Sequence, residues 1–240
     1  MESQHKQTQI IDMFNDIAPT YDTTNRLMSM GADIKWRKEA CKQALKIVAK
    51  PNVNIADIAC GTGDMMLHWA KESVGLEIVI DSIVGVDPSN NMLSIAREKI
   101  IDGIFITAQA DNIPLESNSK DIVSIAYGLR NVVNRRDSLR EFYRILKPNG
   151  VLVILEFMAQ SQKNLPSIFM RLYTKTLLPI VGGIISQNFK AYKYLPKSID
   201  EFITLESLEE ELLLHGLLTI FSKNYSANVC SLVIAQKQKK

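Results

Sequence analysis

Glycines and acidic residues in the first half of the chain have the spacing of a nucleoside-binding site. Residues 55–64 read Ile-Ala-Asp-Ile-Ala-Cys-Gly-Thr-Gly-Asp, an apolar run that contains Asp57 and ends at Gly61 and Gly63. We expect a strand here that turns sharply into a helix, with Thr62 in the turn. Backbone N–H groups at the start of such a helix face any ligand that approaches the glycines closely.

The same loop lacks the residues that bind phosphate groups. A dinucleotide-binding fingerprint needs a third glycine where this chain has Met66, and a P-loop needs a lysine where it has Asp64. Asp57 and Asp64 also place negative charge on both sides of the glycines, which repels phosphate and attracts a cation. The loop therefore suits a nucleoside better than a ligand rich in phosphate.

Asp87 is the second candidate for nucleoside binding. It ends a short apolar run over residues 83–87, and an acid at the end of the second strand of a doubly wound sheet accepts hydrogen bonds from a ribose diol. A simpler explanation is a turn before Pro88 that caps a helix over residues 90–99. Either motif alone is weak, but together, in this order, they favour a nucleoside-binding α/β domain.

The elements that must position these residues alternate along the chain. Strands are expected near residues 55–59, 82–87, 104–108, 121–127, 150–157, 217–223 and 228–235. Helices are expected near residues 8–30 with a break at Ala18-Pro19, and near 36–49, 64–72, 90–101, 136–146 and 205–215. The alternation predicts a parallel sheet covered on both faces. The last two strands are joined by too few residues for a parallel crossover, so they must form an antiparallel hairpin.

These features predict a single α/β domain over residues 1–240, with a seven-stranded, mostly parallel sheet and one antiparallel strand. Residues 1–50 would form an N-terminal helical cap, and residues 158–200 a helical insertion after the fifth strand. Within it, residues 158–199 contain six basic and no acidic residues among many apolar and aromatic ones. Such an insertion fits an apolar substrate or an anionic membrane surface, although an ordinary helical excursion with a solvated basic face has the same composition.

The composition argues against several classes of protein. A net charge of +2 gives no sign of a nucleic-acid partner. Three widely separated cysteines, Cys41, Cys60 and Cys230, indicate a reducing compartment, and no His or Cys has a partner at metal-ligand spacing. The polar N-terminus and the lack of an apolar run of about 20 residues predict neither a signal peptide nor a spanning helix. We therefore expect a cytoplasmic protein without a bound metal.

Several segments resemble one family of methyltransferases. Asp57-Ile-Ala-Cys-Gly-Thr-Gly-Asp64 and Gly85-Val-Asp87 are similar to the first two motifs of S-adenosylmethionine-dependent methyltransferases with a Rossmann-like sheet. More specific are residues 13–25 (MFNDIAPTYDTTN), 127–131 (YGLRN), 144–157 (RILKPNGVLVILEF) and 192–199 (YKYLPKSI). With these, the chain from about Ile10 to Gln236 resembles the ubiquinone/menaquinone biosynthesis C-methyltransferase family (demethylmenaquinone methyltransferase).

The resemblance implies S-adenosylmethionine as co-substrate and a ring carbon of a polyprenylated quinol as methyl acceptor. The residues implied to bind the co-substrate are Asp57, Gly61, Thr62, Gly63, Asp87, Asp111 and Asn112. The glycine loop would hold the methionine part, Asp87 the ribose, and Asp111-Asn112 would lie beside the adenine, in a loop slightly shorter than in the family. Asp33 stands where the family usually shows His, so either Asp33 replaces a base there or another group acts.

Arg130 is the candidate for stabilising the phenolate that makes a quinol carbon nucleophilic. Its charge is permanent, its fork is rigid, and it follows the fourth strand at the edge where open α/β sheets bind substrates. The simpler alternative is a surface ion pair. Tyr21 and Asp22 are candidates for accepting the proton, directly or through water; the alternatives are a loop tyrosine packed on the core and an Asx-turn.

Rival functions stay open on the sequence alone. The same scaffold could serve an O- or N-methyltransferase of another small apolar substrate, a nicotinamide oxidoreductase with a degraded fingerprint, or a non-catalytic membrane-associated binding protein. A polyprenyl quinol resides in the membrane, so we expect peripheral association with the anionic inner membrane face through residues 158–199. The sequence does not distinguish a naphthoquinol from a benzoquinol, and it leaves open the prenyl length and the oligomeric state, a homo-oligomer included.

Overall fold

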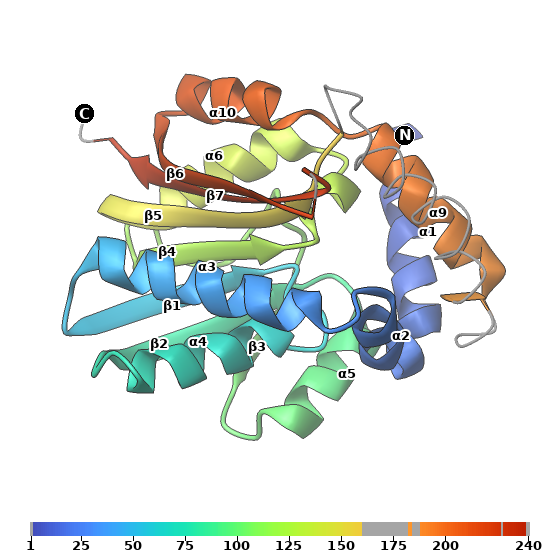
Figure 1. Cartoon of the computed structure of the whole chain (residues 1–240), viewed down its shortest axis with the longest axis horizontal. Coiled ribbons are helices and arrows are strands. Elements are labelled where there is room, and N and C mark those ends of the chain that lie inside the picture. Colours follow the sequence, from blue (N-terminus) through green and yellow to red (C-terminus); the bar gives the residue numbers. More distant parts are fainter. Residues whose placement is uncertain (1, 160–181, 184–187, 227, 239–240) are drawn as a thin grey trace.

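Seven strands form a single sheet in the part of the chain that the structure describes. The computed structural model describes residues 2–159, 182–183, 188–226 and 228–238. The strand order is β3-β2-β1-β4-β5-β7-β6 (Figure 1). The strands are β1 (Asn52–Ile58), β2 (Val79–Asp87), β3 (Ile104–Thr107), β4 (Lys120–Ala126), β5 (Leu146–Phe157), β6 (Leu217–Tyr225) and β7 (Cys230–Lys237).

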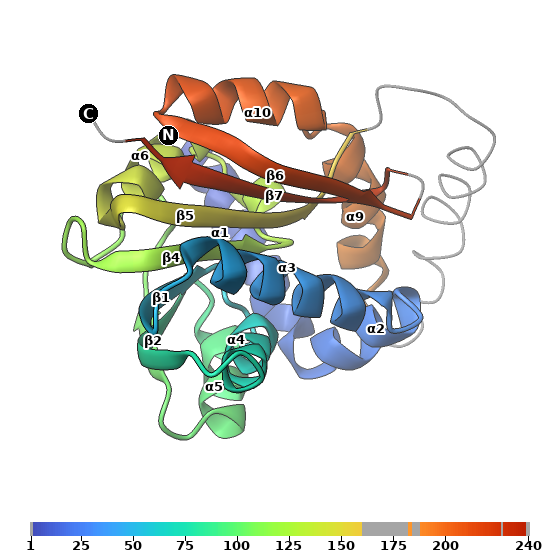
Figure 2. The same cartoon turned by 60° about the vertical axis from the view of Figure 1, so that its left-hand side comes forward.

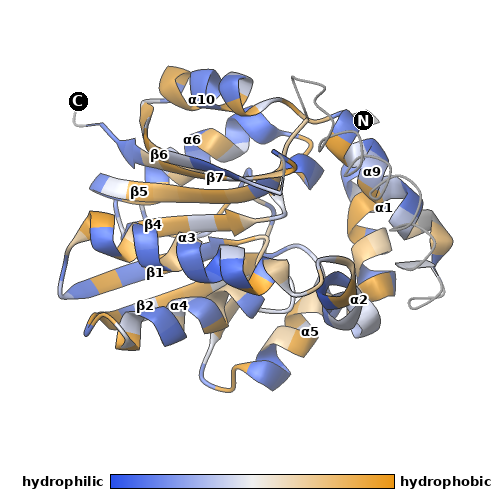
Figure 3. Ribbon diagram, viewed as in Figure 1, coloured by the Kyte–Doolittle hydropathy of each residue, from blue (hydrophilic) through white to orange (hydrophobic). Residues whose placement is uncertain are grey.

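Strand direction follows from the connections. Pairs among β1 to β5 are parallel, whereas β7 pairs antiparallel with both β5 and β6. The few residues between β6 and β7 allow only a hairpin, so the predicted antiparallel strand is confirmed. The central strands β4 and β5 are buried along most of their length, as expected for a sheet covered on both faces, and they form the apolar middle of the molecule (Figure 3).

Helices cover the two faces of the sheet (Figures 1 and 2). One face is covered by α3 (Ala32–Val48), α4 (Asp64–Val74) and α5 (Asn90–Lys99), whose apolar residues meet the sheet in two adjoining clusters. The other face is covered by α6 (Arg135–Ile145) and α10 (Leu205–Leu214). The predicted α/β class is therefore confirmed, with element ends displaced by a few residues.

A cap of helices lies beyond the carboxyl ends of the parallel strands (Figure 1). It consists of α1 (Glu2–Ile17), the short 3-10 turn η1 (Ala18–Thr20), α2 (Tyr21–Met28) and α9 (Phe189–Asp200). The predicted break at Ala18-Pro19 is present as η1. An apolar cluster that includes Ile17, Met28 and Tyr192 joins these helices to Met92 of α5, so the cap is fixed to the domain at the edge where ligands bind in open α/β sheets.

Most of the predicted insertion over residues 158–200 lies outside the described residues. Its described end is helical, since α9 covers residues 189–200; the sequence predicts a helical insertion here without the bounds of this helix. Among the described residues, no helix is long and apolar enough to cross a membrane.

Candidate active site

The loop between β1 and α4 has a left-handed backbone at three positions. φ is +50° at Ala59, +55° at Gly61 and +84° at Gly63, a region that glycine adopts at little cost. A Cβ at Gly63 would also lie 2.9 Å from the Ile100 side chain. The two glycines are therefore needed to bring β1 into α4 within so few residues, and the helix begins with its N-terminus at the loop.

Asp57 is a buried acid held by a chain of hydrogen bonds from the core. It ends β1 beside Ser124 of β4, whose hydroxyl donates to Asp57 Oδ1 at 2.6 Å. The Trp69 indole N–H in turn donates to the Ser124 hydroxyl at 3.0 Å. Asp57 Oδ2 is buried and accepts no hydrogen bond from the described residues. Burial raises the pKa of Asp57 to about 7, so this carboxylate is poised for a hydrogen-bonding or cationic group.

Asp87 fixes the glycine loop from the end of β2. Its two carboxylate oxygens accept from the backbone N–H of Gly61 at 2.9 Å and of Ser89 at 2.8 Å. Burial raises its pKa to about 6, while these two bonds favour the ionised form. Each carboxylate oxygen of Asp87 has a second lone pair with which it can accept a hydrogen bond from a ribose hydroxyl.

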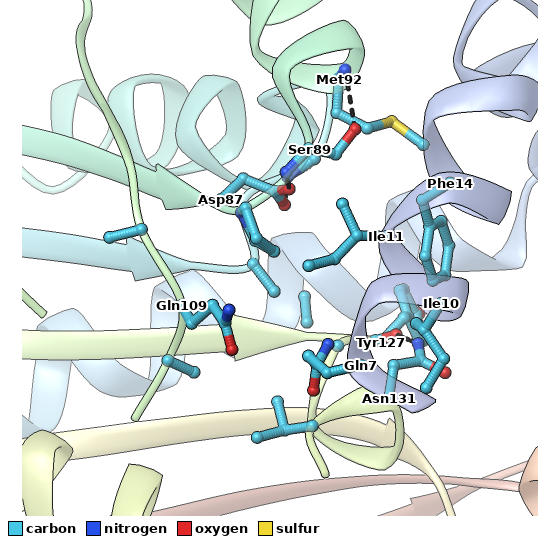
Figure 4. Close-up of a pocket in the computed structure, with 18 of the residues that line it drawn as sticks. Gln7, Ile10, Ile11, Phe14, Asp87, Ser89, Met92, Gln109, Tyr127 and Asn131 are labelled. Atoms are coloured by element: carbon cyan, nitrogen blue, oxygen red, sulfur yellow. Dashed lines mark hydrogen bonds between the residues drawn. The ribbon is translucent and has the colours of Figure 1, made fainter. Parts of the chain in front are cut away.

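Gly61 and Asp87 border a cavity at the carboxyl ends of the strands, called here the nucleoside cavity (Figure 4); Asp57 is not among the residues that line it. Asp87, Ser89 and Gln109 lie on one side, and α1 closes the cavity from the other with Gln7, Ile10, Ile11 and Phe14. Tyr21, Gly61, Asp111, Tyr127 and Asn131 also line it. Its walls thus combine an acid and amides with apolar side chains, a lining suited to a nucleoside.

The predicted co-substrate residues divide into those that line the nucleoside cavity and those that do not, and the buried Asp57 belongs to the second group. Gly61, Asp87 and Asp111 line the nucleoside cavity, and Asp111 also accepts from the Asn134 side-chain amide at 2.7 Å. Thr62 and Gly63 are buried in the loop itself, and Asn112 is exposed and does not line the cavity. Motif reasoning missed Gln7, Gln109 and Asn131; of these, only Asn131 belongs to a segment that the sequence had singled out.

A second cavity, called here the aromatic cavity, has a volume of about 330 Å³. It lies between α2, α3, α9 and the ends of β4 and β5, and its ring-bearing walls include Trp36, Phe157, Tyr192 and Tyr194. Phe14, Tyr21 and Tyr127 line both cavities. The two cavities therefore adjoin each other at these three aromatic side chains.

Arg130 lines the aromatic cavity from the short turn η2 (Leu129–Asn131). Its Nη1 donates to Glu156 Oε1 at 2.6 Å and to the Tyr127 carbonyl at 2.7 Å, and its Nε donates to the Ser198 hydroxyl at 3.3 Å. Glu156 is fully buried. The ion pair considered as an alternative to catalysis is thus present but buried, and it leaves Nη2 without an acceptor among the described residues.

Tyr21 and Asp22 lie in different surroundings. Tyr21 is part of the wall shared by the two cavities; burial raises the pKa of its phenol, against the opposing charges of Arg130 and Arg37. The Asp22 carboxylate faces the glycine loop, where it accepts from the Thr62 hydroxyl at 2.6 Å and pairs with Lys99. The structure therefore connects Tyr21 with the aromatic cavity and Asp22 with the co-substrate loop.

Asp33, which stands where the family usually shows His, is enclosed by donors. Its carboxylate accepts from Arg37 at 2.5 Å, from Arg26 at 3.0 Å and from the Ser29 hydroxyl at 2.5 Å. Arg26 also donates a hydrogen bond through Nη2 to Asp64 Oδ2 at 3.2 Å. The network therefore connects α2 with α3 and with the start of α4. The carboxylate oxygens of Asp33 are thus engaged by three side-chain donors that come from α2, from the residue that follows it and from α3.

Comparisons with known proteins agree with this geometry. Residues 2–237 match the model of the ubiE/COQ5 methyltransferase family. The chain is 47% identical over 232 residues to the ubiquinone/menaquinone biosynthesis C-methyltransferase UbiE of Campylobacter jejuni subsp. jejuni (strain 81-176), covering 97% of this chain and 99% of that protein. It is 41% identical over 201 residues to the demethylmenaquinone methyltransferase of Thermus thermophilus, covering 82% of this chain and 87% of that protein.

A solved structure supports the fold. The SAM-dependent methyltransferase of Thermotoga maritima, described as a possible histamine N-methyltransferase, aligns with a TM-score of 0.59 over 95% of this chain and all of that one. The sequence identity is 20%, so this likeness concerns the arrangement of helices and strands alone.

The buried acid Asp57 predicts how stability depends on pH. A carboxyl whose pKa is raised from 3.8 to about 7 by folding binds its proton more tightly in the native state. Its contribution to the free energy of unfolding therefore falls as pH rises from about 4 to about 7, by up to about 4 kcal/mol, and stays constant above that range. We expect Asp57→Asn, which keeps an acceptor for Ser124, to be more stable than the parent protein at pH 8 and nearly equal at pH 4.

Urea unfolding between pH 4 and 8 measures this effect. Asp102→Asn, at an exposed acid, is the matched control and should leave the pH dependence unchanged. If Asp57→Asn and Asp102→Asn gave the same slope, Asp57 would not be the group that titrates.

Proposed function

The chain belongs to the ubiE/COQ5 methyltransferase family, and from this premise we propose that it methylates a ring carbon of a polyprenylated quinol with S-adenosylmethionine as donor. The observation that carries the proposal is the pair of adjoining cavities that share three aromatic residues, the first with acids and amides and the second with rings and a buried arginine. The curated relatives' names, which refer to menaquinone and ubiquinone synthesis, support the quinol.

The nucleoside cavity fits S-adenosylmethionine. Asp57 does not itself line this cavity, but its buried Oδ2 lacks a donor among the described residues, and the ammonium of the methionine part would supply one. Asp87 would accept from the ribose hydroxyls, and Asp111 and Gln109 lie where the adenine would bind. When bound, the co-substrate supplies an electrophilic methyl group on a sulfonium, and the negative charges of Asp57 and Asp87 favour a cationic ligand over a phosphate.

Arg130 would stabilise the phenolate form of the quinol. A ring carbon becomes nucleophilic when the neighbouring hydroxyl loses its proton, and the developing negative charge then lies beside a buried guanidinium. Glu156 holds the guanidinium by a 2.6 Å hydrogen bond, so its orientation is fixed before the substrate binds. The unused Nη2 donor is available to the oxygen without disturbing this pair.

Tyr21 and Asp22 remain our candidates for the route of the proton. The Tyr21 phenol is held in its neutral form by burial, so it would pass a proton on rather than keep it. Both oxygens of Asp22 already have partners in Thr62 and Lys99, and a proton would reach it only through hydrogen-bonded groups such as water. Asp33 lines the aromatic cavity but is enclosed by three donors, so we assign it no role as a base.

We also propose that the protein is cytoplasmic and associates with the anionic inner face of the membrane. The support is chemical: a polyprenyl tail is held in the bilayer, so the enzyme must reach the head group there. Residues 158–199, basic and apolar, are our candidate for this contact. Of this segment, α9 is described, with an exposed Lys193 and a half-exposed Phe189.

Methyl transfer itself is the first test. Purified protein is incubated with methyl-labelled S-adenosylmethionine and one of two detergent-solubilised acceptors. One acceptor is demethylmenaquinol, and the other is 2-methoxy-6-polyprenyl-1,4-benzoquinol, which lacks the ring methyl group. We expect label in a ring methyl group, and the ratio of the two products identifies the quinol. Label on oxygen or nitrogen, or binding of S-adenosylmethionine without any labelled quinol, would favour the alternative of an O- or N-methyltransferase.

Arg130 can be tested by kinetics. Loss of the cation removes stabilisation that develops with the phenolate, so Arg130→Met should lower kcat about 100- to 1,000-fold with little change in the Kd for S-adenosylmethionine. Because removal of Arg130 leaves Glu156 buried without its cation, the double variant Arg130→Met/Glu156→Gln serves as the control for folding. A kcat close to that of the parent in the double variant would exclude Arg130 from the chemistry.

Flotation with liposomes tests the membrane contact. The protein should float with vesicles that contain anionic lipid and remain below with zwitterionic ones, since the attraction is electrostatic. Lys193→Glu on α9 should weaken flotation, whereas Lys71→Glu, an exposed lysine on α4, should not. No flotation with anionic vesicles would end this part of the proposal.

A further inference from the structure

Arg37 is a second buried arginine in the aromatic cavity, and nothing above gives it a role. It lies on α3 with its side chain 7% exposed, and it lines the cavity. Its Nη1 donates to Asp33 at 2.5 Å. Its Nε is buried and has no acceptor among the described residues. A buried donor without an acceptor is costly, and a ligand oxygen that reached this edge of the guanidinium would offset that cost.

The surroundings of Arg37 parallel those of Arg130. Each guanidinium is paired with a buried acid, Asp33 or Glu156, and each lies over an aromatic ring of the cavity. Arg37 is 4.9 Å from the centroid of Tyr127, and Arg130 is 5.5 Å from that of Phe157. These two rings stack on each other at 5.0 Å. Both arginines line this one cavity, and the charges of both act on Tyr21, which lines it too.

We infer that Arg37 holds the second oxygen of a para-dioxygenated ring, the one opposite the oxygen held by Arg130. This inference rests on the proposed quinol methylation. A 1,4-quinol has acceptor oxygens at its two ends, and two cations at one aromatic cavity match that pattern. Arg37 then selects rings with two para oxygens over phenols with one, and it sets the orientation of the ring carbon toward the wall shared with the nucleoside cavity.

The test is a cycle of enzyme and substrate changes. The substrates are the quinol and its analogue in which the hydroxyl para to the reactive one is replaced by hydrogen; the enzymes are the parent and Arg37→Met. For each enzyme, kcat/KM on the deoxy analogue is compared with kcat/KM on the quinol. The fall from the quinol to the analogue should be about 10- to 100-fold larger for the parent than for Arg37→Met, as expected for a hydrogen bond from a charged donor. Because both enzymes are measured on both substrates, the difference in intrinsic reactivity between the two rings cancels in this comparison.

Two further variants separate substrate binding from support of the fold. Arg26→Met removes the other arginine on Asp33, 3.0 Å away, but Arg26 does not line the cavity; it should keep the parent's discrimination between the two rings. Arg37→Lys should restore part of the discrimination. If turnover of the analogue is too slow to measure, the same comparison can be made with inhibition constants. These are measured for the methylated quinol and its deoxy form with each enzyme.

The outcomes are distinct. If Arg37→Met and Arg37→Lys discriminate between the rings as well as the parent does, Arg37 only supports Asp33 and the inference is wrong. If Arg26→Met loses discrimination equally, the effect belongs to the Asp33 network and the inference is again wrong. If the parent protein binds S-adenosylmethionine but methylates neither ring, the result contradicts the proposed function itself, and with it the inference about Arg37.

Discussion

The structure around the active site depends on keeping one carboxylate, Asp57, inside the protein. A buried acid is expensive because it loses its hydration, and its raised pKa expresses that cost. Ser124 on the neighbouring strand directs its one hydroxyl proton to Asp57 because Trp69 already donates to the same oxygen. The strand pairing, the position of α4 and the orientation of the acid are thus coupled, and one carboxylate oxygen is left without a donor among the described residues.

The cap extends this arrangement into a two-chamber site. Phe14 of α1, Tyr21 of α2 and Tyr127 after β4 come from distant parts of the sequence and form the wall between the cavities. Charged contacts fix α2 at this position, through Asp22 to Thr62 and Lys99 and through Arg26 to Asp64. A displacement of α2 would therefore alter both cavities and the glycine loop together. We infer that the cap aligns the two ligands as well as covering them.

The sequence predicts features that depend on residues close together in the chain, and it does not predict contacts between residues that are far apart in it. The sheet, its antiparallel strand and the placement of Gly61 and Asp87 at the nucleoside cavity depend on short contiguous patterns and connection lengths, and these are local. Ser124 and Glu156 act through neighbours across strands, and their partners are fixed only when the strands pair. The function of Asp33 was uncertain for the same reason, because its three donors depend on how α2 packs against α3.

The pairing of each cavity arginine with an acid also explains how an apolar cavity can contain cations. An isolated guanidinium would be costly to bury and would hold water, whereas the pairs Arg37–Asp33 and Arg130–Glu156 are each close to neutral. A neutral quinol can then enter without displacing strongly bound charge. In the proposed reaction, the negative charge that forms when the quinol loses its proton would meet donors that are already oriented, so the interaction would strengthen as the reaction proceeds. Such a site would stabilise the transition state more than the bound substrate, which is the condition for catalysis.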